Sequence, residues 1–203
     1  MKSILPFFKI IRWTNLLFIA LTQYLFYHVV FYALLPKGIN YPFSQYQEFF
    51  IYIMMASVLI AAAGYIINDY FDINIDEVNK PDRMVVDKHI HRRWAIAWHF
   101  MLSSSGLILT LFALPFTQKW YLVLANAGSV VLLWFYSTNF KKGLLFGNFV
   151  ISLLTAWTIL IIFFSKLSLA DATGSNGVAH AQFFRISFLY AGFAFIISLI
   201  REA

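Results

Sequence analysis

The chain contains no cysteine among its 203 residues, and only 12% of its residues are charged. The first absence excludes disulfide bonds, thiolate metal sites and cysteine nucleophiles. The second argues against a soluble domain, because a soluble domain of this size needs more polar side chains to cover its surface. What the sequence has instead is 61% hydrophobic residues, gathered in long uncharged runs. This composition is typical of a helical membrane protein that crosses the bilayer several times.

Six apolar runs are long enough to cross a bilayer, which takes about 20 helical residues. Each run is expected to be a helix, since an isolated strand would leave its backbone groups unpaired in lipid. The sequence therefore predicts an all-α transmembrane bundle that forms one membrane domain over residues 1–203. The six predicted helices cover 13–35, 49–67, 94–116, 120–140, 144–164 and 183–200.

The formal net charge of +6 is unevenly distributed over the segments between these runs. The basic residues form no continuous patch, so nucleic acid is not an expected partner. Most of them precede the first run or follow the second and fourth runs, and the positive-inside rule places those segments in the cytoplasm. We therefore expect an integral protein of the inner or plasma membrane with a cytoplasmic N-terminus.

A cluster of acidic residues follows the second apolar run. Asn68, Asp72 and Asp76 are spaced by four residues, and Asp69 precedes Asp72 by three. If the helix continues, these side chains lie on one face. Neighbouring carboxylates repel one another unless a cation lies among them, and oxygen ligands suit Mg²⁺. Because Mg²⁺ usually keeps part of its shell for waters and phosphate oxygens, the cluster predicts a site for a diphosphate substrate.

Two other interpretations of the cluster are less consistent with the sequence. A solvated acidic loop is disfavoured because Asn68 and Asp69 directly follow an apolar helix, where an unpaired acid is costly. The nearby Lys80 and Arg83 could also bind diphosphate oxygens. A divalent-cation transporter would need acids in the middle of the membrane, whereas these acids lie at one helix end.

The segment Asn68-Asp69-x-x-Asp72-x-x-x-Asp76 resembles the first motif of the UbiA superfamily of intramembrane prenyltransferases, written NDxxDxxxD. The stretch from Val78 to Arg83 is also similar to that family. So are two further patterns, Arg12-x-x-Asn15 before the first run and Tyr136-Ser137 followed by Lys141 and Gly147-Asn148.

The resemblance implies a nine-helix fold, of which this chain matches the first two-thirds, without the family's second Asp-rich motif. It also implies Mg²⁺-dependent transfer of an isoprenyl group from an isoprenyl diphosphate to a lipophilic acceptor in the bilayer. Carried over residue by residue, it assigns three sets of candidates. These are Asn68, Asp72 and Asp76 as metal ligands, Asp69, Asp72 and Asp76 as catalytic residues, and Asn15, Lys80, Arg83 and Lys141 as substrate-binding residues.

Several alternatives stay open at this point. The acceptor is an aromatic or quinone precursor, a lipid of the geranylgeranylglycerol-phosphate type, or a haem or chlorophyll ring, and the flanks of the acidic segment favour the lipid. The missing second motif allows a truncated, non-catalytic relative that binds prenyl diphosphate, metal or a partner. It also allows a split enzyme whose C-terminal half is a separate chain.

Overall fold

The computed structural model describes residues 4–31, 33, 43–79, 84–113, 120–143, 145–165 and 177–202. Within these ranges the chain is built of helices and contains no β-strand, although Val86 and Ile90 form an isolated bridge. The helices are α1 (Ile4–Ile10), α2 (Trp13–Leu25), the π-helix η1 (Phe26–Phe31), α3 (Phe43–Phe71), α4 (Ile73–Asn79), α5 (Arg92–Phe112), α6 (Trp120–Thr138), the 3₁₀-helix η3 (Phe140–Lys142), α7 (Phe146–Ser165) and α9 (Gly177–Glu202).

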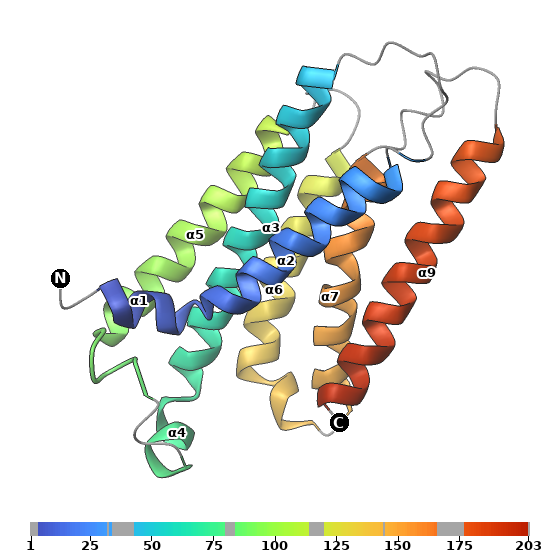
Figure 1. Ribbon diagram of the computed structural model, residues 1–203. Helices are drawn as coiled ribbons and strands as arrows, with labels where there is room; N and C mark the ends of the chain where they lie inside the picture. The colour runs from blue at the N-terminus through green and yellow to red at the C-terminus, as the bar shows by residue number, and fades with distance from the viewer. Residues whose placement is uncertain are drawn as a thin grey trace.

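Two helix pairs form the sides of the bundle (Figure 1). Helix α5 packs along α3, and α9 packs along α7. Helix α6 joins the pairs because it contacts both α3 and α7, and α2 crosses over α3 and reaches α7. The space enclosed by α2, α3, α6 and α7 therefore lies at the centre of the molecule.

Small side chains allow α3 and α5 to approach closely. The buried face of α5 carries Ser103, Gly106 and Thr110. A Cβ atom added at Gly106 would lie 3.1 Å from the carbonyl oxygen of Ala56 on α3. Close backbone approach through small residues is the usual way in which transmembrane helices gain packing contacts.

Five helices in the described part of the chain are long and apolar enough to cross a membrane, and they confirm five of the predicted spans. The predicted span 13–35 is different, because α2 ends at Leu25 and the chain continues as the π-helix η1. Residues 34 and 35 lie outside the described residues.

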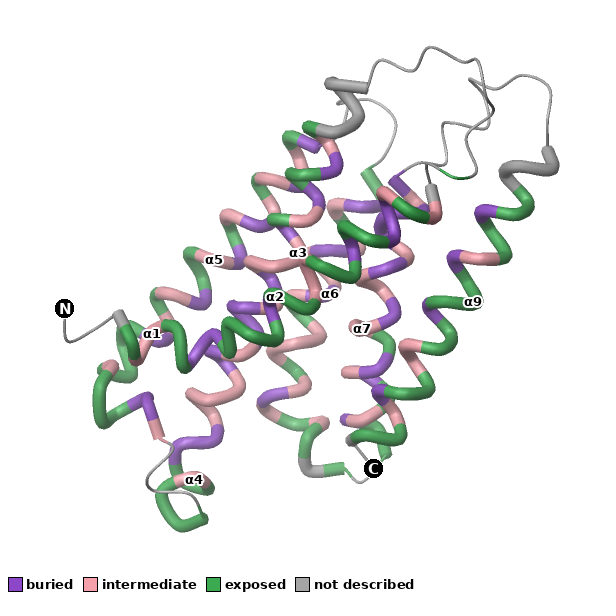
Figure 2. The backbone as a smooth tube through the Cα atoms, in the orientation of Figure 1, coloured by how far each residue is buried: buried purple, intermediate pink, exposed green. Residues whose placement is uncertain are grey.

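The outer surface of the bundle is apolar. On α9, Leu189 and Ile200 expose 70% and 71% of their surface, and Phe193 exposes 64%. Figure 2 shows exposed, green stretches along α9. Such a surface would be unfavourable in water and is expected of helices that face lipid. The protein is therefore an integral membrane protein.

Candidate functional site

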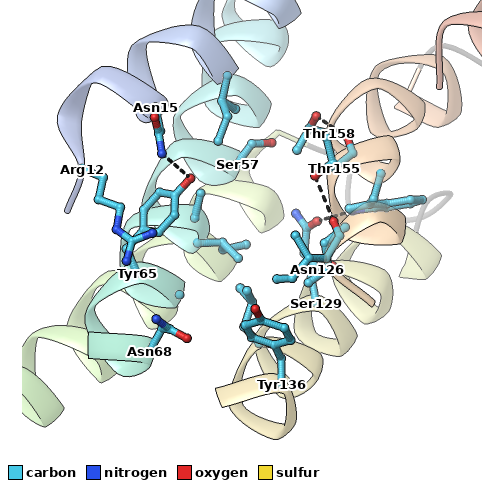
Figure 3. A pocket seen from close by; sticks show the side chains of 18 of the residues that line it. Arg12, Asn15, Ser57, Tyr65, Asn68, Asn126, Ser129, Tyr136, Thr155 and Thr158 are labelled. Carbon is cyan, nitrogen blue, oxygen red and sulfur yellow. Dashed lines mark hydrogen bonds between the residues drawn. The ribbon is translucent and has the colours of Figure 1, made fainter. Parts of the chain in front are cut away.

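A cavity of about 210 Å³ lies between α2, α3, α6 and α7. Figure 3 shows Asn68 and Tyr136 toward one end of this cavity and Ser57 and Thr158 toward the other. Arg12 and Arg201 also line it. We call the end formed by Arg12, Asn68 and Arg201 the charged end. Arg12 keeps 45% of its side chain exposed, so this end reaches the surface of the protein.

The acidic motif lies at the charged end and keeps a helical register. Helix α3 stops at Phe71 and α4 starts at Ile73, with a turn at Asp72 between them. The backbone N–H of Asp72 still donates to the carbonyl of Asn68 at 3.0 Å, and that of Asp76 donates to the carbonyl of Asp72 at 2.8 Å. The four-residue repeat therefore runs through the junction, and these three residues occupy one helical face.

Lys141 connects two members of this face. Its ammonium group forms an ion pair with Asp72 Oδ2 and donates to Asn68 Oδ1 at 3.3 Å. Asn68 Nδ2 in turn donates to Asp72 Oδ2 at 3.0 Å. The side chain of Asp72 is 11% exposed, so a positive partner offsets much of the cost of burying its carboxylate. Lys141 places its positive charge between two oxygens from α3 and the following turn.

The turn that carries Lys141 depends on a glycine. Lys141 belongs to η3, which packs against the start of α7. A Cβ atom added at Gly147 would lie 2.8 Å from the carbonyl oxygen of Phe140, closer than real contacts of this kind. The neighbouring backbone cannot yield as a flexible side chain would, so only glycine permits this approach. Gly147 thereby holds Lys141 within reach of Asp72.

Arg12 engages a different carboxylate. Its Nη2 atom donates to Asp69 Oδ1 at 3.1 Å, and its guanidinium carbon lies 5.0 Å from the centre of the Tyr65 ring. The backbone of Arg12 is left-handed, with φ 51° and ψ 55°, at the elbow between α1 and α2. This conformation is uncommon for a residue with a side chain. The ion pair and the cation–π contact fix the elbow over the cavity.

The remaining predicted residues are distributed as follows. Asn15 lines the cavity, and its Nδ2 donates to the hydroxyl of Tyr65 at 3.4 Å. Asp76 lies half-buried at the start of α4. Lys80 and Arg83 lie outside the described residues, and their roles stay predictions. The structure thus brings Asn15, Asn68, Asp72 and Lys141 to one end of the bundle and turns Asp69 toward Arg12.

The donor set at this end fits Mg²⁺ bound together with phosphate. The Oδ1 atom of Asn68 and the carboxylate of Asp72 are hard oxygen ligands, and the ammonium group of Lys141 lies between them. In the described part of the chain, no three His, Cys, Asp or Glu side chains are arranged to hold a metal ion by themselves. A site with one or two carboxylates suits Mg²⁺ when substrate phosphates complete the shell.

Comparison with known proteins identifies the family of the chain. The model of the UbiA prenyltransferase family matches residues 24–202. The chain belongs to the UbiA prenyltransferase family. Family membership confirms the resemblance that the acidic motif indicates.

Two relatives in the family share the same name, digeranylgeranylglyceryl phosphate synthase. A digeranylgeranylglyceryl phosphate synthase of Methanoregula boonei is 38% identical over 104 residues, which cover 51% of this chain and 36% of that protein. The enzyme of the same name from Sulfurisphaera tokodaii is 28% identical over 157 residues, or 76% of this chain and 50% of that protein. The matched segments thus span half or less of these relatives.

A solved structure described as digeranylgeranylglyceryl phosphate synthase in membranes has the same fold. It superimposes with a TM-score of 0.65 at 22% identity. The match covers all of this chain and 60% of the solved one. At this identity the likeness supports the helical arrangement.

Sequence reasoning missed several residues of the site. Arg12 belongs to the Arg12-x-x-Asn15 pattern, but nothing in the sequence linked it to Asp69, which lies 57 positions away. The cavity-lining aromatic residues Tyr65, Tyr136 and Trp157 could not be separated from the many aromatic residues that pack or face lipid. Tyr136 alone carried a signal, because it belongs to a pattern similar to the family's.

Proposed function

We propose that this protein transfers an isoprenyl group from an isoprenyl diphosphate to a lipophilic acceptor. The proposal rests on one observation: charged residues gather at one end of a cavity that lies inside a membrane bundle. One end gathers Asn68, Asp72, Arg12 and Lys141, and the cavity runs from there between membrane-spanning helices. A charged head joined to a hydrocarbon tail fits this arrangement, because the head can meet Arg12 and Asn68 while the tail passes the apolar lining residues Ile60, Leu133 and Leu154.

The roles of the residues follow from their positions. Asn68 and Asp72 would hold Mg²⁺, and Asp76 stands one turn further along the same face. Bound Mg²⁺ supplies charge neutralisation that helps the diphosphate leave C1 of the isoprenyl chain. Lys141 then offers its ammonium group to diphosphate oxygens, as Lys80 and Arg83 are also predicted to do. Asp69 holds Arg12 over the cavity and so acts on the substrate indirectly.

For the acceptor, we favour a lipid of the geranylgeranylglycerol-phosphate type. Its support is that relatives from several archaea carry the name digeranylgeranylglyceryl phosphate synthase. In the transfer, the bond between C1 and the diphosphate oxygen breaks and an acceptor oxygen bonds to C1. The proton of the acceptor hydroxyl is released, and diphosphate leaves with the electron pair.

The test is a transfer assay with the purified full chain in lipid nanodiscs. Geranylgeranyl diphosphate and geranylgeranylglycerol phosphate are supplied with Mg²⁺, and the diether product is quantified by mass spectrometry. A second reaction replaces the lipid with an aromatic acid acceptor. Product from the lipid alone supports the proposal, whereas product from the aromatic acid alone contradicts the acceptor class.

Because the chain covers 60% of the solved relative, the assay is also run with a co-expressed polypeptide that carries the remaining part of such a relative. Turnover only in its presence would indicate a two-chain enzyme. Binding of prenyl diphosphate without turnover in either reaction would indicate the non-catalytic alternative.

We also propose that the charged end of the cavity faces the cytoplasm. The support is the excess of lysine and arginine in the segments at that end. The absence of cysteine gives a clean background for labelling. The Lys88→Cys variant should react with an impermeant maleimide in inverted membranes but not in intact cells. Labelling in intact cells would reverse the orientation.

A further inference from the structure

The cavity stops at a layer of neutral polar side chains. This layer, which we call the polar floor, consists of Gln23, Ser57, Asn126, Trp157 and Thr158, drawn from α2, α3, α6 and α7. All but Gln23 line the cavity directly. Ser57 stands eleven residues before Asn68 on α3, which corresponds to about 16 Å at the rise of an α-helix.

Hydrogen bonds tie the polar floor together across helices. Gln23 Nε2 donates to Ser57 Oγ at 3.0 Å and to the carbonyl of Thr158 at 2.7 Å. The indole N–H of Trp157 donates to Asn126 Oδ1 at 3.0 Å, and Asn126 Nδ2 donates to Thr110 Oγ1 on α5 at 2.8 Å. Both ends of the Asn126 amide are therefore occupied, and the Trp157 ring is held in place.

A closely packed apolar core lies one helical turn beyond the polar floor. The next residues on the same faces of α3, α6 and α7 are Ile53, Leu122, Ile161 and Ile162. Each of them is no more than 3% exposed and belongs to a single hydrophobic cluster. In this direction the described residues close the cavity at the polar floor. On the side of α9, a second cavity borders it and shares Thr155 and Arg201 with it.

We propose that the polar floor, with Trp157 as its main barrier, sets the longest isoprenyl chain that the cavity accepts. This inference rests on the proposed function. The floor's hydrogen-bonding groups mostly bind one another or the backbone, although the buried Gln23 Oε1 has no partner among the described residues. The floor therefore serves better as a fixed wall than as a recognition site for a polar ligand. A hydrocarbon end that reached it would gain nothing by displacing these bonds.

The geometry also predicts how far the limit moves. Removing the Trp157 side chain opens the space up to the next layer, about one helical turn or 5.4 Å away. An isoprenyl unit adds four chain bonds, which span about 5 Å when extended, as judged from 3.8 Å for three backbone bonds. Trp157→Ala should therefore admit one additional isoprenyl unit. Ser129→Leu, which fills the cavity on the near side of Asn126, should exclude one.

The experiment measures binding, so that turnover is not required. The full chain in nanodiscs with Mg²⁺ is titrated with the thiolodiphosphates of geranyl, farnesyl, geranylgeranyl and geranylfarnesyl chains, which resist ionisation. We expect the affinity of the wild-type protein to rise with the length of the isoprenyl chain up to the longest chain that fits, and to fall for longer chains. Trp157→Ala should bind the first excluded chain at least about tenfold more tightly, because one more unit is buried. Trp94→Ala is the matched control, since Trp94 is 62% exposed and distant from the cavity lining.

The outcomes separate the two proposals. A limit that moves up in Trp157→Ala and down in Ser129→Leu supports the polar floor as the barrier. An unchanged limit in whichever of these variants folds, or no limit in the wild type, overturns this inference and leaves the proposed function standing. Failure of the wild type to bind any of the four compounds contradicts the proposed function and this inference together.

Discussion

The two ends of the central cavity are both polar, but they are built differently. At the charged end, Lys141 pairs with Asp72 and Arg12 pairs with Asp69. At the polar floor, neutral amide, hydroxyl and indole groups bond to one another. Charges are tolerated where the cavity reaches the surface and water, whereas only neutral groups with partners can be buried deeper at moderate cost. At the charged end, the side chains can therefore leave their ion pairs and bind a ligand. The side chains of the polar floor are suited to stay in place.

The largest effect expected at the charged end comes from Asp72→Asn. The substitution removes the charge that would hold Mg²⁺ and leaves Lys141 without its carboxylate. We expect turnover to fall by about 100-fold or more, in the range that metal-site substitutions produce. The assay is product formation under saturating Mg²⁺.

The control for this substitution is Asp87→Asn. Asp87 also forms an ion pair, with Arg92 at 2.9 Å, but both side chains are about half exposed and lie away from the cavity. Asparagine tolerates its left-handed backbone, with φ 73°. An equal loss of turnover in both variants would show that Asp72 has no special role.

Gly147→Ala should have the next largest effect. The added Cβ would meet the Phe140 carbonyl at 2.8 Å, and relieving this clash should cost about 1–3 kcal/mol of stability. Displacement of Lys141 should also weaken diphosphate binding. Thermal unfolding in detergent measures the first effect and isothermal calorimetry the second.

Gly128→Ala is the matched control on α6, because nothing lies within 4 Å of a Cβ placed there. It should leave stability unchanged or raise it by up to about 1 kcal/mol through helix propensity. Similar losses in both glycine variants would remove the argument that Gly147 permits a close approach.

At the polar floor, Asn126→Ala should change stability more than chemistry. Two interhelical hydrogen bonds disappear, and bonds of this kind in membranes contribute about 0.6–2 kcal/mol each. Turnover of a short donor such as geranyl diphosphate should stay within about twofold of wild type, since the charged end is intact. A loss of turnover as large as that of Asp72→Asn would show that the two ends do not act separately.

The smallest effect is expected from the pair of Arg12 and Asp69. Arg12 is 45% exposed, so solvent screens the interaction, and a double-mutant cycle with Arg12→Gln and Asp69→Asn should give a coupling of about 0.2–1 kcal/mol. Denaturant unfolding in mixed micelles measures this coupling. Additive effects of the two substitutions would show that the ion pair does not hold the elbow.

The helices were largely predictable, and their ends were not. The runs of apolar residues located α3, α5, α6, α7 and α9, because length and hydropathy decide whether a segment can cross a bilayer. Nothing in the run beginning at Trp13 indicated that α2 would give way to a π-helix at Phe26. That change depends on packing against neighbouring helices, which a single segment does not encode.

The site was predictable only where its residues are close in sequence. The spacing of Asn68, Asp72 and Asp76 placed them on one face, because helical register is a local property. The contacts of Lys141 with Asp72 and of Arg12 with Asp69 join positions 69 and 57 residues apart, so they exist only once the helices are packed.

The sequence by itself therefore determined that this is a helical membrane protein with an acidic face at one helix end, since composition and periodicity control both features. Tertiary structure alone decided which cation meets which carboxylate, because pairing requires segments 57 and 69 residues apart to meet. It also decided where the cavity stops, because the polar floor combines side chains from four helices.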